Sequence, residues 1–152
     1  MIEEFVKSTL SQDVGRGDLY ALVEPSVSAS AKIIAKSDGI MAGVEYIDVL
    51  AKLENFEIKW NKSDGESFIK GDVLATLSGT SHVLLKIERT LLNMLLHASS
   101  IATLTRKYVE IVEPYGVKLL DTRKTRPLLR IFEKYATRCG GAVNHRMGLD
   151  DS

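Results

Sequence analysis

A leucine-rich segment places the strongest constraint on how this chain can fold. Seven apolar residues recur at helical spacing between positions 84 and 96: Leu84, Leu85, Ile87, Leu91, Leu92, Leu95 and Leu96. Residues 101–112 predict a second helix, or a continuation of the first with a kink near Ser99. A helix with so much apolar surface must be covered by other elements. A chain of 152 residues with 45% apolar content can supply one core of ordinary size.

The rest of the sequence predicts alternating helices and strands. Helical spacing is found at 2–10 and 43–53, and strands are expected at 31–35, 56–60, 67–69 and 73–77. Pro114 and Gly116 end the long apolar segment. A short strand at 117–120 then precedes a polar loop and a helix that runs from about Pro127 to Cys139. The order of elements predicts an α+β region followed by a strand–loop–helix unit that resembles the opening of an α/β barrel or sheet.

The charges of the chain are distributed unevenly, although its net charge is zero. Residues 1–117 carry 12 bases and 16 acids, whereas residues 118–146 carry 8 bases and 2 acids. A local excess of this kind favours an anionic partner near the second segment. A solvated basic helix face is the alternative.

Several classes of protein are disfavoured by the sequence. No apolar run is long enough to span a bilayer, and acids at Glu3 and Glu4 stand where a secretory signal would carry bases. The single cysteine, Cys139, excludes an internal disulfide, so we expect a cytoplasmic protein. The basic segment has few interleaved aromatic residues, so nucleic acid is not an expected partner. No zinc-ligand spacing, Walker motif or nucleophile elbow is present.

A pattern of glycines and acids at 64–74 occurs in the barrel-sandwich carriers of lipoyl and biotinyl groups. Such a carrier needs an exposed lysine at the tip of the next hairpin, but the residues there are Gly79-Thr80-Ser81-His82. We therefore interpret the glycines of this segment as turn residues.

The segment Asp121-Thr122-Arg123-Lys124-Thr125 is the first candidate binding site. It directly follows a predicted strand, where ligands collect in α/β folds. The planar fork of Arg123 matches a carboxylate or phosphate, and Lys124 adds a point charge. Two cations between two hydroxyls suit a small anion with several charges, although a basic surface loop remains possible.

Two further candidates follow the same logic. His145 and Arg146 lie just after Gly140-Gly141, and glycines permit close approach of a ligand to the backbone. Glu88 and Arg89 interrupt the leucine-rich helix, where they either pair with each other or present Arg89 to an anion at a subunit interface.

These motifs together resemble the quinolinate phosphoribosyltransferase family. The shared segments occur in family order along the chain, namely Glu88-Arg89-Thr90-Leu91-Leu92-Asn93, Ile101-Ala102-Thr103, Asp121-Thr122-Arg123-Lys124-Thr125, Glu133-Lys134-Tyr135-Ala136 and Asn144-His145-Arg146-Met147-Gly148-Leu149. The commoner family sequence after Arg-Lys-Thr is Thr-Pro-Gly-Leu-Arg, whereas this chain has Arg126-Pro127-Leu128-Leu129-Arg130. This departure concerns the shape of the loop and removes no charge.

The resemblance implies an N-terminal open-faced α/β sandwich over residues 1–112 and the start of a truncated α/β barrel over residues 113–152. It also implies phosphoribosyl transfer from phosphoribosyl pyrophosphate to quinolinate, which gives nicotinate mononucleotide, pyrophosphate and carbon dioxide in NAD biosynthesis. The residues implied to bind substrate are Thr122, Arg123, Lys124, His145 and Arg146, with Arg89 contributed to the partner's site in a homodimer. Mg2+ is the implied cofactor, and its ligands are expected beyond residue 152.

The family chain is roughly twice as long as this one, so we expect a fragment that is inactive by itself. Two alternatives stay open: a divergent or non-catalytic relative, such as the homologues associated with molybdenum transport, and a truncated dimerisation module.

Overall fold

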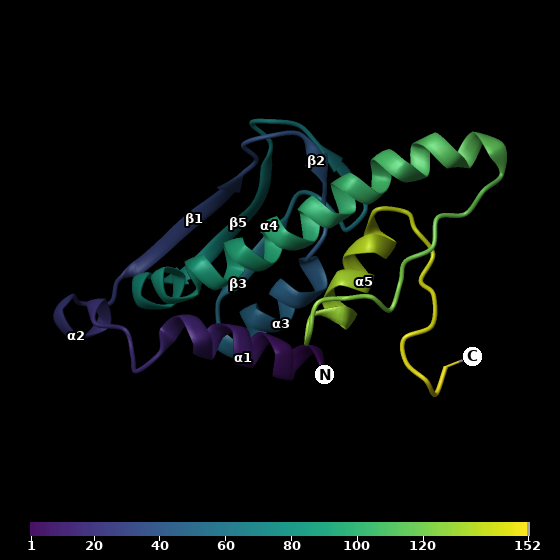
Figure 1. Ribbon diagram of the computed structural model, residues 1–152. Helices are drawn as coiled ribbons and strands as arrows, with labels where there is room; N and C mark the ends of the chain where they lie inside the picture. Colours follow the sequence, from purple (N-terminus) through teal and green to yellow (C-terminus); the bar gives the residue numbers. More distant parts are fainter. Residues whose placement is uncertain (152) are drawn as a thin grey trace.

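The computed structural model describes residues 1–151 and combines helices with two small antiparallel sheets (Figure 1). The helices are α1 (Ile2–Val14), α2 (Tyr20–Val23), α3 (Val44–Glu54), α4 (Ser81–Val112), the 3-10 helix η1 (Glu113–Tyr115) and α5 (Arg130–Cys139). The strands are β1 (Ser28–Ile34), β2 (Gly39–Ile40), β3 (Glu57–Trp60), β4 (Ser67–Phe68) and β5 (Val73–Thr80). This mixture confirms the predicted α+β fold class, and no closed barrel is formed within residues 1–151.

The larger sheet has the order β1-β5-β3 and is covered by helices on one face. Alternation sets the two faces: Ile58 and Trp60 are partly buried, whereas Glu57 and Lys59 are exposed. β5 is the central strand and carries the buried residues Leu74, Ala75 and Leu77. Since α4 packs on β1 and β5, and α3 packs on β3, the N-terminal part is an open-faced sandwich (Figure 1).

The leucine-rich segment forms one continuous helix, α4, of 32 residues. Its start is fixed by Thr80, whose hydroxyl accepts a hydrogen bond from the backbone N–H of Val83 at 3.3 Å. The possible break near Ser99 does not occur. Ser99 is buried and donates from its hydroxyl to the carbonyl oxygen of Ala42 at 3.1 Å. None of the helices within residues 1–151 is both long and apolar enough to cross a membrane.

The C-terminal part contains one strand–helix–strand unit. Leu120 and Val143 form an isolated parallel β-bridge, with α5 as the crossover between them. The predicted strand at 117–120 is therefore reduced to a single bridged position. The helix begins at Arg130 and not at Pro127, because Leu128 adopts a positive φ of 66° that interrupts a helical start.

Aromatic side chains join this unit to the sandwich. Phe132 of α5 stacks on Phe5 of α1 with centroids 5.0 Å apart, and it meets Tyr46 of α3 edge-on at 4.6 Å. Tyr135, one turn further along α5, lies 5.1 Å from Tyr46. These rings place α5 on the sandwich beside the C-terminal half of α4 (Figure 1).

Gly140 allows the end of α5 to approach α4 closely. A Cβ atom at this position would lie 2.6 Å from the carbonyl oxygen of Ala102 and 2.6 Å from Thr105 Cβ. Close approach to a ligand was the sequence interpretation of this glycine, but its close neighbour is the backbone of α4.

Candidate functional site

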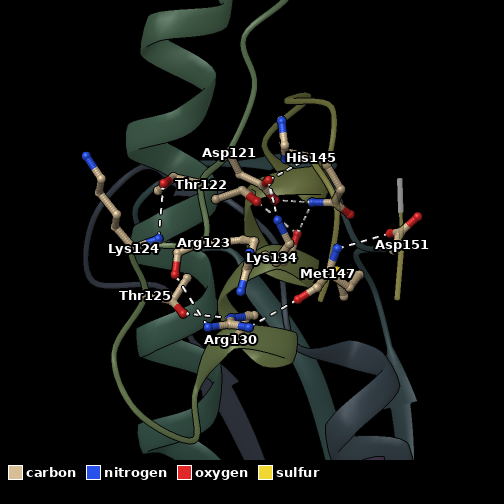
Figure 2. A network of polar contacts seen from close by, with 12 residues as sticks. Asp121, Thr122, Arg123, Lys124, Thr125, Arg130, Lys134, His145, Met147 and Asp151 are labelled. Atoms are coloured by element: carbon tan, nitrogen blue, oxygen red, sulfur yellow. Dashed lines mark hydrogen bonds and ion pairs between the residues drawn. The ribbon is translucent and has the colours of Figure 1, made fainter. Parts of the chain in front are cut away.

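Asp121 is the centre of the network that joins the two candidate loops. Its Oδ1 forms an ion pair with Lys134 and accepts the backbone N–H of His145 at 2.7 Å. Its Oδ2 accepts Nδ2 of Asn144 at 2.5 Å. The carboxylate therefore ties a first loop, residues 121–125, to a second loop, residues 144–147 (Figure 2).

Backbone hydrogen bonds of the β-bridge set the two loops side by side. Val143 donates to the carbonyl oxygen of Leu119 at 2.9 Å, and Asp121 donates to the carbonyl oxygen of Val143 at 3.2 Å. Both loops thus begin at the carboxyl ends of two parallel segments, and α/β folds assemble binding sites at these ends.

Arg123 has an unsatisfied donor within this arrangement. Its Nε is buried and has no hydrogen-bond partner in the part of the chain that the structure describes. Figure 2 shows its side chain turned toward Lys134 and Arg130. A buried donor without an acceptor is unfavourable by about 1–3 kcal/mol, so an anion that accepts from Arg123 would be stabilised here.

The other predicted site residues of the first loop lie differently. The hydroxyl of Thr122 accepts the backbone N–H of Lys124 at 3.1 Å, which tightens the turn. The exposed side chain of Lys124 points away from the network around Asp121 (Figure 2). In the second loop, His145 and Arg146 are exposed, and His145 is bonded to the first loop through its backbone N–H.

Arg89 lies on a different element from the two loops. It is exposed on α4, and no ion pair or hydrogen bond of its side chain is found within residues 1–151. The alternative in which Glu88 pairs with Arg89 is therefore not realised among these residues.

Three of the eight bases between residues 118 and 146 have internal partners. Lys134 is 1% exposed and pairs with Asp121, and Arg126 donates from Nε to Glu133 at 2.6 Å. Arg130 bonds to Thr125, Arg123 and Met147. The basic excess is thus neither a uniform solvated face nor wholly available to a ligand.

Arg130 was not among the predicted site residues. A signal was present in the sequence, because Arg130 occupies the first turn of a helix, where the macrodipole disfavours a cation. A cation at that place indicates acceptors outside the helix, here the carbonyl oxygens of the two loops.

The one cysteine offers no nucleophile to this site. Burial, together with the nearby charge of Asp64, raises the pKa of the Cys139 thiol to about 11. The thiol is therefore protonated near neutral pH.

Comparison with known proteins identifies the family. The family model described as quinolinate phosphoribosyl transferase, N-terminal domain, matches residues 18–99, and its C-terminal domain model matches residues 101–152. The chain belongs to the quinolinate phosphoribosyltransferase family. The two models meet inside α4, and the predicted domain boundary between residues 112 and 113 stays a prediction.

Curated relatives of this family resemble the chain along nearly its whole length. A probable carboxylating nicotinate-nucleotide pyrophosphorylase of Bacillus subtilis is 44% identical over 92% of the chain. A protein of the same name from Synechocystis is 37% identical over 100% of it. The chain spans about half the length of these relatives, 50% and 52% respectively.

Solved structures of the family share the fold. The nicotinate-nucleotide pyrophosphorylase of Francisella tularensis superposes with a TM-score of 0.93 at 35% identity, covering 99% of this chain and 55% of that one. The protein NadC of Streptococcus pyogenes gives a TM-score of 0.91 at 36% identity, with 99% and 55% covered.

The described residues do not fit the magnesium ion implied for the family. No group of three or more His, Cys, Asp or Glu side chains within residues 1–151 could hold a metal ion. Asp121, the carboxylate of the first loop, already accepts from Lys134, Asn144 and His145.

Proposed function

We propose that the whole protein transfers a phosphoribosyl group from phosphoribosyl pyrophosphate to quinolinate. The products are nicotinate mononucleotide, pyrophosphate and carbon dioxide, so the protein serves NAD biosynthesis. The buried, unpartnered Nε of Arg123 carries this proposal most directly, because it lies at the junction of two loops that bear further cations.

The chemistry of quinolinate fits the basic side chains of the two loops. Quinolinate carries two adjacent carboxylates, and charge-assisted hydrogen bonds from Arg123, His145 and Arg146 would orient it. We assign Thr122 to a polar contact with the same ligand, and Lys124 to the rim of the site, because its side chain points away from Asp121. When carbon dioxide leaves, these fixed cations would stabilise the negative charge that develops on the pyridine ring.

A homodimer would add Arg89 to the partner's site. Spacings of four and seven residues place Leu85, Arg89 and Leu96 on one face of α4. Leu85 is 48% exposed and Leu96 69% exposed, and Leu104 and Ile111 extend the same apolar stripe. Leu85 and Leu96 flank Arg89, and an apolar surface that carries a cation suits a second copy of the chain, whose site would receive that cation.

Two further parts of the proposal concern the cofactor and the compartment. Magnesium would take its protein ligands from beyond residue 152 and would also bind the phosphates of the second substrate. A single cysteine in 152 residues favours the cytoplasm.

The test is quinolinate-dependent formation of nicotinate mononucleotide by the whole protein, measured with R123A, H145A and R138Q variants. We expect R123A and H145A to lower kcat/KM at least about 100-fold, since each removes a charge-assisted contact worth a few kcal/mol. Arg138 is an exposed base of α5, so R138Q is the matched control and should retain activity. Full activity in both R123A and H145A would contradict the residue assignment, and no calorimetric heat with quinolinate would favour a non-catalytic relative.

A further inference from the structure

The two loops need a support that holds them at a fixed separation, and α5 supplies it. We propose that Arg130 and Lys134 act as positioning residues, a two-point clamp that sets the geometry of the first and second loops without contacting substrate. The meaning of the clamp for catalysis rests on the proposed function, but its effect on the loops does not.

Arg130 forms the first point of the clamp. Its Nε donates to the hydroxyl of Thr125 at 3.1 Å, and its Nη2 lies 3.4 Å from the carbonyl oxygen of Arg123. Its Nη1 donates to the carbonyl oxygen of Met147 at 3.2 Å. One planar guanidinium thus bridges both loops, and each of its three nitrogens is engaged within the protein (Figure 2).

Lys134 forms the second point, one helical turn further along α5. Its buried ammonium pairs with Asp121, whose two oxygens hold His145 and Asn144 of the second loop. Its own carbonyl oxygen accepts Nδ2 of Asn144 at 2.8 Å. Since residues four apart share one face of a helix, both points act from the same side of α5.

The environment of Lys134 distinguishes it from a substrate ligand. Lys134 is 1% exposed and the side chain of Asp121 is 5% exposed, so solvent and substrate reach neither charge easily. Arg123, by contrast, keeps an unpartnered Nε. We therefore assign two roles to the basic residues: those of α5 position the two loops, and those of the loops bind the anion.

The experiment compares R130Q, R130K and R138Q by hydrogen exchange of backbone amides and by quinolinate kinetics, all in the whole protein. Without substrate, the amides of Asp121, Val143 and His145 should exchange about tenfold faster in R130Q, because hydrogen bonds to a charged group are lost. R130K should behave like R130Q, because an ammonium cannot bridge three acceptors in one plane. R138Q removes the same charge from the same helix and should exchange as the wild type does.

The kinetic readout separates positioning from direct binding. KM for quinolinate should rise about tenfold in both R130Q and R130K, more than kcat falls. Recovery of KM in R130K with unchanged exchange would identify Arg130 as a charge that binds the anion, and would overturn the clamp. Unchanged exchange in R130Q would also overturn it. Faster exchange in a protein that does not use quinolinate would support the clamp and reject the proposed function.

The Lys134–Asp121 pair is tested as a unit with the double variant D121N/K134M, because K134M alone would bury an unpaired carboxylate. An asparagine has one acceptor oxygen where Asp121 uses two, so one bond to the second loop is lost. We expect faster exchange at residues 144–146 in the double variant, and normal exchange there would contradict the role of the second point.

Discussion

Leu128 departs from the commoner family sequence at a position where the backbone is left-handed. Its φ is 66°, in the left-handed region, and its side chain is 97% exposed. The commoner family sequence has glycine here, which adopts this conformation without a steric penalty. A leucine in the same conformation is disfavoured by about 1–2 kcal/mol.

Replacing Leu128 with glycine should therefore stabilise the protein. The gain is expected to be about 0.5–1 kcal/mol, because the strain removed exceeds the added flexibility of the unfolded chain and no packing is lost. The measurement is the midpoint of urea unfolding. Leu149, 80% exposed and without a positive φ, is the matched control, and L149G should not stabilise. A lower midpoint in L128G would show that the backbone is unstrained.

At the scale of elements, a buried phenol adds hydrogen bonds to the aromatic contacts that join α5 to the sandwich. Tyr135 donates its hydroxyl to Asp64, and its oxygen accepts the backbone N–H of Gly43 at 3.1 Å. Burial raises the pKa of Tyr135, and the hydrogen bond to Asp64 raises it further. Arg106 of α4 adds bonds to the carbonyl oxygens of Gly65, at 3.2 Å, and Gly140, at 3.0 Å.

Tyr135→Phe should weaken this junction in a pH-dependent way. The loss is expected to be about 1–3 kcal/mol near neutral pH, because Asp64 and Gly43 lose a partner. Because the folded pKa is raised, the stabilising contribution is fully present below the unfolded pKa of about 10 and is lost as the pH rises above it. The difference in unfolding free energy between wild type and Y135F should thus shrink at alkaline pH.

Urea unfolding at a series of pH values measures this difference. Tyr115, which is 82% exposed, provides the control, and Y115F should leave the free energy of unfolding nearly unchanged. A difference that stays constant across the alkaline range would show that the pKa of Tyr135 is no higher in the folded state than in the unfolded state.

The same elements show what periodicity can predict. Alternation at 56–60 placed β3 correctly, since one face of that strand is covered and the other is exposed. Helical spacing predicted α1 and α3. The predicted α1 ends four residues early, because the last turn of the helix contains residues that are typical of turns. The start of α5 was misplaced because Pro127 suits a first helical turn, whereas Leu128 after it is not helical.

At the scale of the whole molecule, the exposed apolar stripe of α4 bears on assembly. Leu85 and Leu96 of this stripe flank Arg89, which lies apart from the two loops of its own chain. A shared site therefore predicts complementation between subunits.

Mixing R89A subunits with R123A subunits should restore activity. If Arg89 serves the partner's site, a mixed dimer contains one intact site, so it should show about half of wild-type turnover per dimer. Each variant alone should be nearly inactive. The measurement is nicotinate mononucleotide formation by tagged, purified hybrids of the whole protein. Inactive hybrids would place Arg89 in the site of its own chain, and an active R89A dimer would show that it serves neither site.

The sequence by itself determined most of the helices and strands, the order of the motifs and the loops that bear the cations. These depend on local periodicity and on residue chemistry, which can be read along the chain. Only the tertiary structure decided which cations are internal and which remain available. Lys134 pairs with Asp121, which is 13 residues away in the sequence. Tyr135 bonds to Asp64, which is 71 residues away. The role of a charged side chain depends on partners that folding brings from distant segments, and charge counted along the sequence contains no record of that pairing.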